Sequence, residues 1–216
     1  MRSLLEAPVR RGDDVSAVFA RSARIALAGL LAAPALLGAA SVAGCPLRAA
    51  SGPAFWLSAL AGFGGAGWFA GSSLGLEPRR RAALGGAFLA VGALVAPSFH
   101  GLQDLTGREP LPAVAAATLL PFTAAFALAG ALAARTLGIT RLGAAGLLAC
   151  AAGGLLGGAF ALLPFLWAWT RIDVPGGSYL VMGLAIVGFL GCLIAPFHVV
   201  GATLGRARDA KGLAGT

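Results

Sequence analysis

The chain has only two histidines, His100 and His198, and they stand in similar surroundings. Gly-Ala-Leu-Val-Ala-Pro-Ser-Phe precedes His100, and Gly-Cys-Leu-Ile-Ala-Pro-Phe precedes His198. The prolines of the two stretches, Pro97 and Pro196, are each predicted to kink a helix, and they are separated by close to half the chain. Imidazole changes its charge near neutral pH, so histidines in apolar surroundings could carry a proton or line a polar path.

Two interpretations of these histidines remain open. Each imidazole could donate a hydrogen bond to a carbonyl that the nearby proline leaves without its helical partner. Alternatively, His100, Gln103 and His198 are the polar residues of a path across a membrane, because ionisable groups at that depth are functional candidates by default. The predicted depths of the histidines differ by roughly 15 Å, whereas metal–nitrogen bonds are about 2 Å long. We therefore expect neither a shared metal nor any other cofactor.

No other part of the sequence has the spacing of a catalytic or metal-binding motif. The three cysteines, Cys45, Cys150 and Cys192, show no paired spacing. Serine-hydrolase, zinc-protease, phosphate-loop and Cys-x-x-Cys motifs are all missing from the sequence. We therefore predict no catalytic residues and no enzyme activity. The stretch Val-Ala-Gly-Cys that ends at Cys45 is similar to a lipoprotein attachment site, but an ordinary helix end is the preferred interpretation.

Six long stretches without Asp, Glu, Lys or Arg would form the helices that position His100, Gln103 and His198. A helix of about 20 apolar residues crosses a hydrocarbon core of about 30 Å. All 16 Lys and Arg residues and all 8 Asp and Glu residues lie outside the stretches, so no charge would have to enter lipid. The stretches are residues 25–47, 49–76, 82–103, 110–134, 142–170 and 174–205. The sequence thus predicts an all-α, polytopic integral membrane protein with a bundle of six transmembrane helices.

This prediction divides the chain into three parts. Residues 1–24 form a cytoplasmic segment in which a helix begins near Val15 at the membrane surface. Residues 25–205 form the six-helix domain, and residues 206–216 form a cytoplasmic tail. No connecting loop is long enough to make a soluble domain.

The distribution of basic residues predicts the orientation of the chain. The net charge is +8 and the pI is about 11.2, which alone could suggest nucleic-acid binding. With the N-terminus in the cytoplasm, however, the three outer loops hold only Arg48, Arg108 and Arg171, and all other Lys and Arg residues lie inside. This asymmetry follows the positive-inside rule. We therefore predict a bacterial inner-membrane protein with both termini cytoplasmic, a lipid bilayer as its partner and no nucleic-acid binding.

Glycines recur at helical spacing in the fifth and second stretches. Gly146, Gly154 and Gly158 fall on one stripe of the fifth, and Gly67 and Gly71 are four residues apart in the second. Small residues let helices approach closely in lipid, where no hydrophobic force drives their association. The glycines predict packing within the bundle, or alternatively a homo-oligomer or contacts with other membrane subunits.

The likeness between the two histidine-containing stretches also suggests a 3+3 inverted repeat. Repeats of this kind build many transporters, whose sites lie near the midplane. On this basis we expect a small-solute permease or channel-like protein. The alternative is a non-catalytic membrane subunit that scaffolds or regulates a larger complex, since the spans hold no charge and many small residues.

Overall fold

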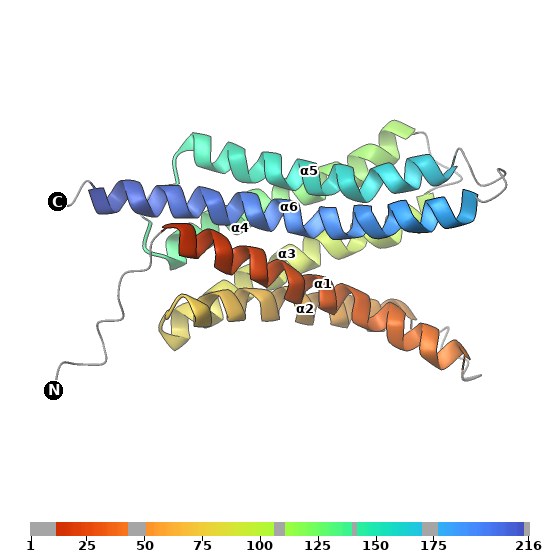
Figure 1. Ribbon diagram of the computed structural model, residues 1–216, viewed down its shortest axis with the longest axis horizontal. Helices are drawn as coiled ribbons and strands as arrows, with labels where there is room; N and C mark the ends of the chain where they lie inside the picture. The colour runs from red at the N-terminus through yellow and green to blue at the C-terminus, as the bar shows by residue number, and fades with distance from the viewer. Residues whose placement is uncertain (1–11, 43–50, 106–110, 140–141, 170–176, 214–216) are drawn as a thin grey trace.

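The structure is a computed structural model, and it describes residues 12–42, 51–105, 111–139, 142–169 and 177–213 (Figure 1). All regular structure in these residues is helical. The helices are α1 (Gly12–Val42), α2 (Ser51–Ser73), α3 (Pro78–Leu105), α4 (Leu111–Thr136), α5 (Ala144–Trp169) and α6 (Gly177–Leu213). The predicted all-α fold with six long helices is confirmed.

Five of the helices are long and apolar enough to cross a membrane, namely α1, α3, α4, α5 and α6. Within the described residues, α2 does not qualify as a span, because its many Gly and Ser residues and two Trp residues lower its hydropathy. The apolar helices identify a multi-pass membrane protein, since helices of this kind need lipid around them.

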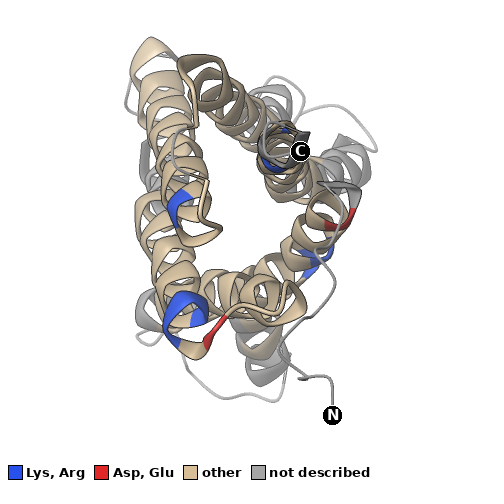
Figure 2. Ribbon diagram, turned by 90° about the vertical axis from the view of Figure 1, so that its left-hand side faces the viewer, with Lys and Arg blue, Asp and Glu red and all other residues tan. Residues whose placement is uncertain are grey.

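The six helices form a closed ring in chain order. Each helix packs against the next one along the chain, and α6 returns to pack against α1. Figure 2 looks along the bundle and shows this ring from one end. Neighbouring helices run antiparallel, so α1 begins and α6 ends at the same end of the bundle (Figure 1).

The ring order bears on the suggested inverted repeat. An inverted repeat would exchange α1–α3 with α4–α6 by a two-fold rotation about an axis in the membrane plane. Such a rotation reverses the sense in which helices follow one another around the ring, yet α1–α3 and α4–α6 follow one another in the same sense. The helix order therefore does not show a 3+3 repeat.

The turns that follow α2 and α4 are closed by glycines in the left-handed region. Gly75 has a φ of 68° and Gly138 a φ of 75°. After α2, the N–H of Leu76 donates to the Gly71 carbonyl at 3.0 Å, and after α4 the N–H of Ile139 donates to the Ala134 carbonyl at 2.9 Å. These bonds satisfy carbonyls at the helix ends, in the manner of Schellman motifs.

The Lys, Arg, Asp and Glu residues whose side chains the structure describes lie toward the end of the bundle where α1 begins and α6 ends, which is the end that faces the viewer in Figure 2. Examples are Arg79 and Arg80 at the start of α3, Arg135 at the end of α4, and Arg206 on α6. The predicted outer-loop arginines Arg48, Arg108 and Arg171, and also Cys45, lie outside the described residues. This end is referred to below as the charged end.

Candidate functional site

Buried phenylalanine side chains pack together inside the ring of helices. Among the side chains that the structure describes, these fully buried rings come from every helix except α5. The cluster, called here the aromatic core, consists of Phe19, Phe63, Phe88, Phe122, Phe126 and Phe197. Helix α5 contributes glycines instead, which lets its backbone approach the rings of α4.

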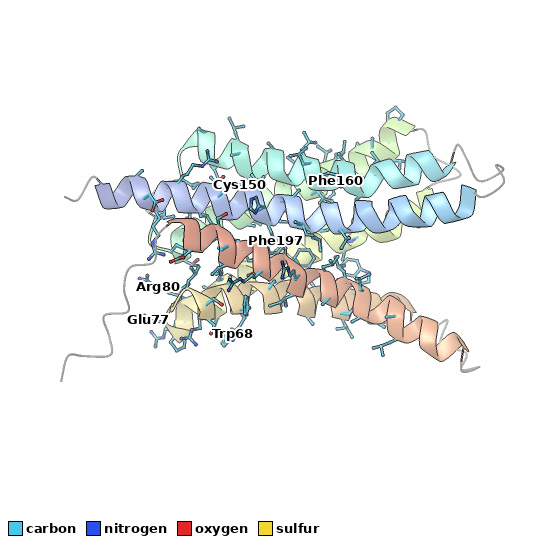
Figure 3. The ribbon with its side chains drawn as sticks, in the orientation of Figure 1. Trp68, Glu77, Arg80, Cys150, Phe160 and Phe197 are labelled. Atoms are coloured by element: carbon cyan, nitrogen blue, oxygen red, sulfur yellow. The ribbon has the colours of Figure 1, made fainter. Side chains whose placement is uncertain are left out.

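Phe197 of α6 occupies the centre of the aromatic core (Figure 3). Its ring centroid lies 5.0 Å from that of Phe88 on α3 and 5.7 Å from that of Phe126 on α4. It also lies 6.2 Å from Phe63 on α2. These separations are typical of favourable aromatic pairs. Because α3 and α6 are not neighbours in the ring, their contact through Phe88 and Phe197 closes the bundle axis with apolar rings.

The buried hydroxyl groups that the structure describes form hydrogen bonds within their own helices. Thr118 donates to the Val114 carbonyl at 3.0 Å, and Thr203 donates to the Val199 carbonyl at 2.8 Å. Ser22 donates to the Val18 carbonyl at 2.9 Å. A hydroxyl that is bonded in this way has no proton left for a solute. These groups therefore offer no free hydrogen-bond donor along the axis.

His198 points away from the aromatic core. Its side chain is exposed, whereas the adjacent Phe197 is buried. On α6 the histidine follows Leu190 and Ile194 at four-residue spacing, and both of these are also exposed. Successive residues on a helix point about 100° apart, so Phe197 can face the core while His198 faces outward. His198 thus belongs to the outer surface of the bundle.

The other polar-path candidates, His100 and Gln103, lie in the last turns of α3. Their side chains are outside the part of the structure that is described. The α3 backbone still sets the depth of His100: Gly85 lies beside Trp68 of α2, and His100 is about 22 Å further along the helix. His198 lies at about the level of Trp68, so the structure does not bring the two histidines together. Among the described residues, no group of three or more His, Cys, Asp or Glu lies together.

The helices continue through the two prolines of the histidine-containing stretches. Pro97 lies within α3 and Pro196 within α6. Pro97 is exposed, whereas Pro196 is buried against α5, where a Cβ at Gly157 would lie 2.5 Å from Pro196 Cγ. Pro196 therefore has a packing partner, while Pro97 faces outward.

The predicted glycine positions lie at helix contacts, with one difference among them. Cβ atoms at Gly154 and Gly158 would meet the α4 backbone at Phe122 and Leu119, and a Cβ at Gly67 would lie 2.5 Å from the Leu84 carbonyl oxygen of α3. A Cβ at Gly71 would lie 3.0 Å from Arg81 Cα. Gly146 instead faces the flexible side chain of Leu142 at 2.8 Å, so its contact is softer.

Among the described glycines, the shortest contact across a helix crossing joins two that helical spacing does not indicate. Gly29 of α1 and Gly62 of α2 lie against each other, and a Cβ at Gly62 would lie 2.6 Å from Gly29 Cα. Gly201 of α6 similarly faces α1, with Phe19 Cβ 2.7 Å from its Cβ position. A lone glycine in an Ala- and Gly-rich helix carries no periodic signal, so only the register between helices reveals such contacts.

Cys150 of α5 links three helices. Its thiol hydrogen-bonds with Thr203 of α6, and its Sγ would lie 2.5 Å from a Cβ at Gly130 of α4. Both Cys150 and Cys192 are buried cysteines. A buried cysteine of this kind behaves as a small apolar packing residue.

The contact between Gly130 and Cys150 can be tested with a pair of substitutions. Gly130→Ala is expected to destabilise the bundle by about 1–3 kcal/mol, because the new methyl overlaps Cys150 Sγ in a packed interior. Cys150→Ala in the Gly130→Ala background should restore part of that loss by removing the sulfur. Unfolding by SDS titration in mixed micelles measures both effects. A Gly130→Ala variant as stable as Gly143→Ala, whose methyl enters open space, would contradict the contact.

Comparison with protein-family models, with curated proteins and with solved structures gives no match for this chain.

Proposed function

We propose that the chain is a non-catalytic membrane subunit that scaffolds or regulates a larger membrane complex. The aromatic core carries this proposal, because apolar rings occupy the axis along which a solute path would run. The buried hydroxyls of Ser22, Thr118 and Thr203 are bonded to their own helices. The outward position of His198 adds support, since a polar path through the bundle would need that side chain inside.

The proposal includes an inner-membrane topology with six crossings. Helix α2 packs between α1 and α3 along the ring, so its chain must run back through the same layer as its neighbours. Six crossings place both termini on one side. The arginines of the charged end favour the cytoplasm for that side by the positive-inside rule. Loss of α2 as a span would instead put the two termini on opposite sides.

The outer face of α5 offers apolar side chains for lipid or a partner helix. Leu148 is 69 % exposed, and Leu155 and Leu156 are about half exposed. Phe160, a turn further on, is 38 % exposed (Figure 3). Aliphatic and aromatic side chains of this kind suit knobs-into-holes contact with another apolar helix.

Purification of the full chain from its native membrane in a mild detergent tests the subunit role. We expect a second membrane protein to co-purify in a fixed ratio, and to be lost when Leu148→Arg and Leu155→Arg are introduced together. Recovery of this chain alone, from membranes in which cross-linking also captures only this chain, would contradict the proposal.

A permease is the second candidate, and the closed ring favours it. Six helices that surround a plug of apolar rings resemble the closed state of a path gated by a hydrophobic constriction. In that case, Phe197→Ala in reconstituted vesicles should raise the leak of small solutes, and replacement of both His100 and His198 by Ala should alter transport. If vesicles with the Phe197→Ala variant leak no more solute than vesicles with wild type, the result favours the subunit role.

A further inference from the structure

An exposed group of polar and aromatic side chains lies at one level of the bundle on three neighbouring helices. The group, called here the inner belt, consists of His198 on α6, Arg21 and Arg24 on α1, and Trp68 on α2. All four side chains are exposed, and Trp68 is 50 % exposed. Helices α6, α1 and α2 are consecutive in the ring, so the belt follows one side of the bundle.

The contact between α1 and α6 sets the level of Arg21 and His198 along the bundle. A Cβ at Gly201 would lie 2.7 Å from Phe19 Cβ and 3.1 Å from Ser16 Cα. The helices are antiparallel, so moving forward from Phe19 to Arg21 and backward from Gly201 to His198 leads in the same direction (Figure 1). The two steps are about 3 Å and 5 Å at 1.5 Å per residue. Arg21 and His198 therefore lie within about one helical turn of each other in depth.

The contact between α1 and α2 adds the other two residues. Ile25 Cγ2 lies 3.7 Å from the Cβ position of Gly65. Arg24 is the residue before Ile25, and Trp68 is three residues after Gly65 on the antiparallel helix. Both steps lead toward the charged end, by about 2 Å and 5 Å. Arg24 and Trp68 thus share the level of Arg21 and His198.

The belt falls where the apolar outer surface of this side ends. Beyond Arg24, the chain has no charged residue until Arg48, a length that spans a hydrocarbon core of about 30 Å as a helix. Exposed residues of α1 beyond the belt include Leu31 and Leu36. Arginine and tryptophan side chains are favoured at the boundary between hydrocarbon and headgroups.

We infer that the inner belt binds the phosphate of anionic phospholipid headgroups. Two guanidinium groups supply charge and forked donors that match phosphate oxygens, and the imidazole and indole supply further N–H donors. The belt itself contains no carboxylate, and Asp14 lies two turns away on α1. The position at the hydrocarbon boundary makes the lipid itself the phosphate source. The inference rests on membrane insertion alone and is independent of the subunit role.

Native mass spectrometry of the full chain tests the belt. The protein is released from micelles that contain equal amounts of phosphatidylglycerol and phosphatidylcholine, and the ratio of bound lipids is measured. We expect wild-type protein to retain phosphatidylglycerol preferentially. The double variant R21Q/R24Q should lose this preference by up to about 25-fold, since each cation near an anionic surface contributes roughly fivefold.

A matched control separates the belt from general surface charge. The variant R79Q/R80Q removes the same charge from exposed positions at the start of α3, and it should keep the preference within about twofold. Circular dichroism and size-exclusion profiles must match wild type for both variants. His198→Leu, at an exposed position, removes the imidazole donor and provides a second readout with an expected loss of about two- to fivefold, the effect of one net hydrogen bond.

Four results would overturn the inference. The first is an unchanged preference in both R21Q/R24Q and His198→Leu. The second is an equal loss in R79Q/R80Q, which would mean that diffuse charge attracts the lipid. The third is that R21Q/R24Q releases a bound protein and leaves the lipid ratio unchanged, which would assign the belt to an acidic partner helix. Displacement of the lipid by inorganic phosphate at millimolar concentration would also count against it.

Discussion

Gly29→Ala is expected to cost about 3 kcal/mol of stability and to push α1 away from α2. The new Cβ would overlap Gly62 Cα and would lie 2.8 Å from the Ser58 carbonyl oxygen. Both obstacles are backbone atoms, which cannot rotate out of the way as a side chain can. Overpacking at such a contact costs about 1–3 kcal/mol, and the upper end applies where only helix displacement relieves it. SDS titration in mixed micelles, followed by circular dichroism, measures the loss.

Gly86→Ala is the matched control for this substitution. Gly86 lies on α3 with nothing within 4 Å of its Cβ position, so a methyl meets no neighbour. Alanine also removes the cost of glycine in a helix, and stability should stay the same or rise by up to about 1 kcal/mol. If both variants unfold at the same SDS concentration as wild type, the α1–α2 crossing is not as close as described.

Phe197→Ala is expected to be the most destabilising truncation in the bundle, at about 3–5 kcal/mol. The ring is fully buried and contacts rings from α2, α3 and α4. Its removal leaves a cavity where side chains of helices that are not neighbours in the ring, α6 with α2 and α3, contact each other. The same SDS titration gives the change in unfolding free energy.

Phe160→Ala serves as the comparison for Phe197→Ala. Phe160 is 38 % exposed on α5 and lies against Gly191 of α6, so its loss should cost under about half as much. If both variants lose the same amount of unfolding free energy, the effect depends only on the size of the removed ring. The position of Phe197 in the aromatic core would then have no special importance for stability. A Phe197→Ala variant with wild-type stability would contradict the core directly.

The positions of the helices could be predicted from sequence because charge is excluded from lipid. The uncharged stretch 110–134 matches α4 at Leu111–Thr136, and the stretch 142–170 matches α5 at Ala144–Trp169. The match is poorer at α6, which continues to Leu213 past Arg206 and Arg208. The helix packs against the start of α1 at Gly201 and continues from there for about three turns, so charge alone does not end the helix at Arg206.

The inward faces of the helices could not be predicted, and this limited the prediction of the site. A soluble helix reveals its buried face by its apolar stripe, but a helix in lipid is apolar on all sides. Phe197 and His198 are adjacent, and nothing in their order indicates that Phe197 faces the axis. The interpretation of His198 as part of a path assumed that His198, and not Phe197, faces the axis. The aromatic core was missed for the same reason.

The central claim is that the bundle crosses a membrane with its charged end in the cytoplasm, α2 included. Single cysteines placed at Arg48, Glu77, Arg108 and Arg208 in a cysteine-free background test it in intact cells with a membrane-impermeant maleimide. The account predicts labelling from outside at residues 48 and 108, and labelling at residues 77 and 208 only after the membrane is broken. Labelling of residues 48 and 77 from the same side would remove α2 as a crossing, and with it the shared side of the two termini.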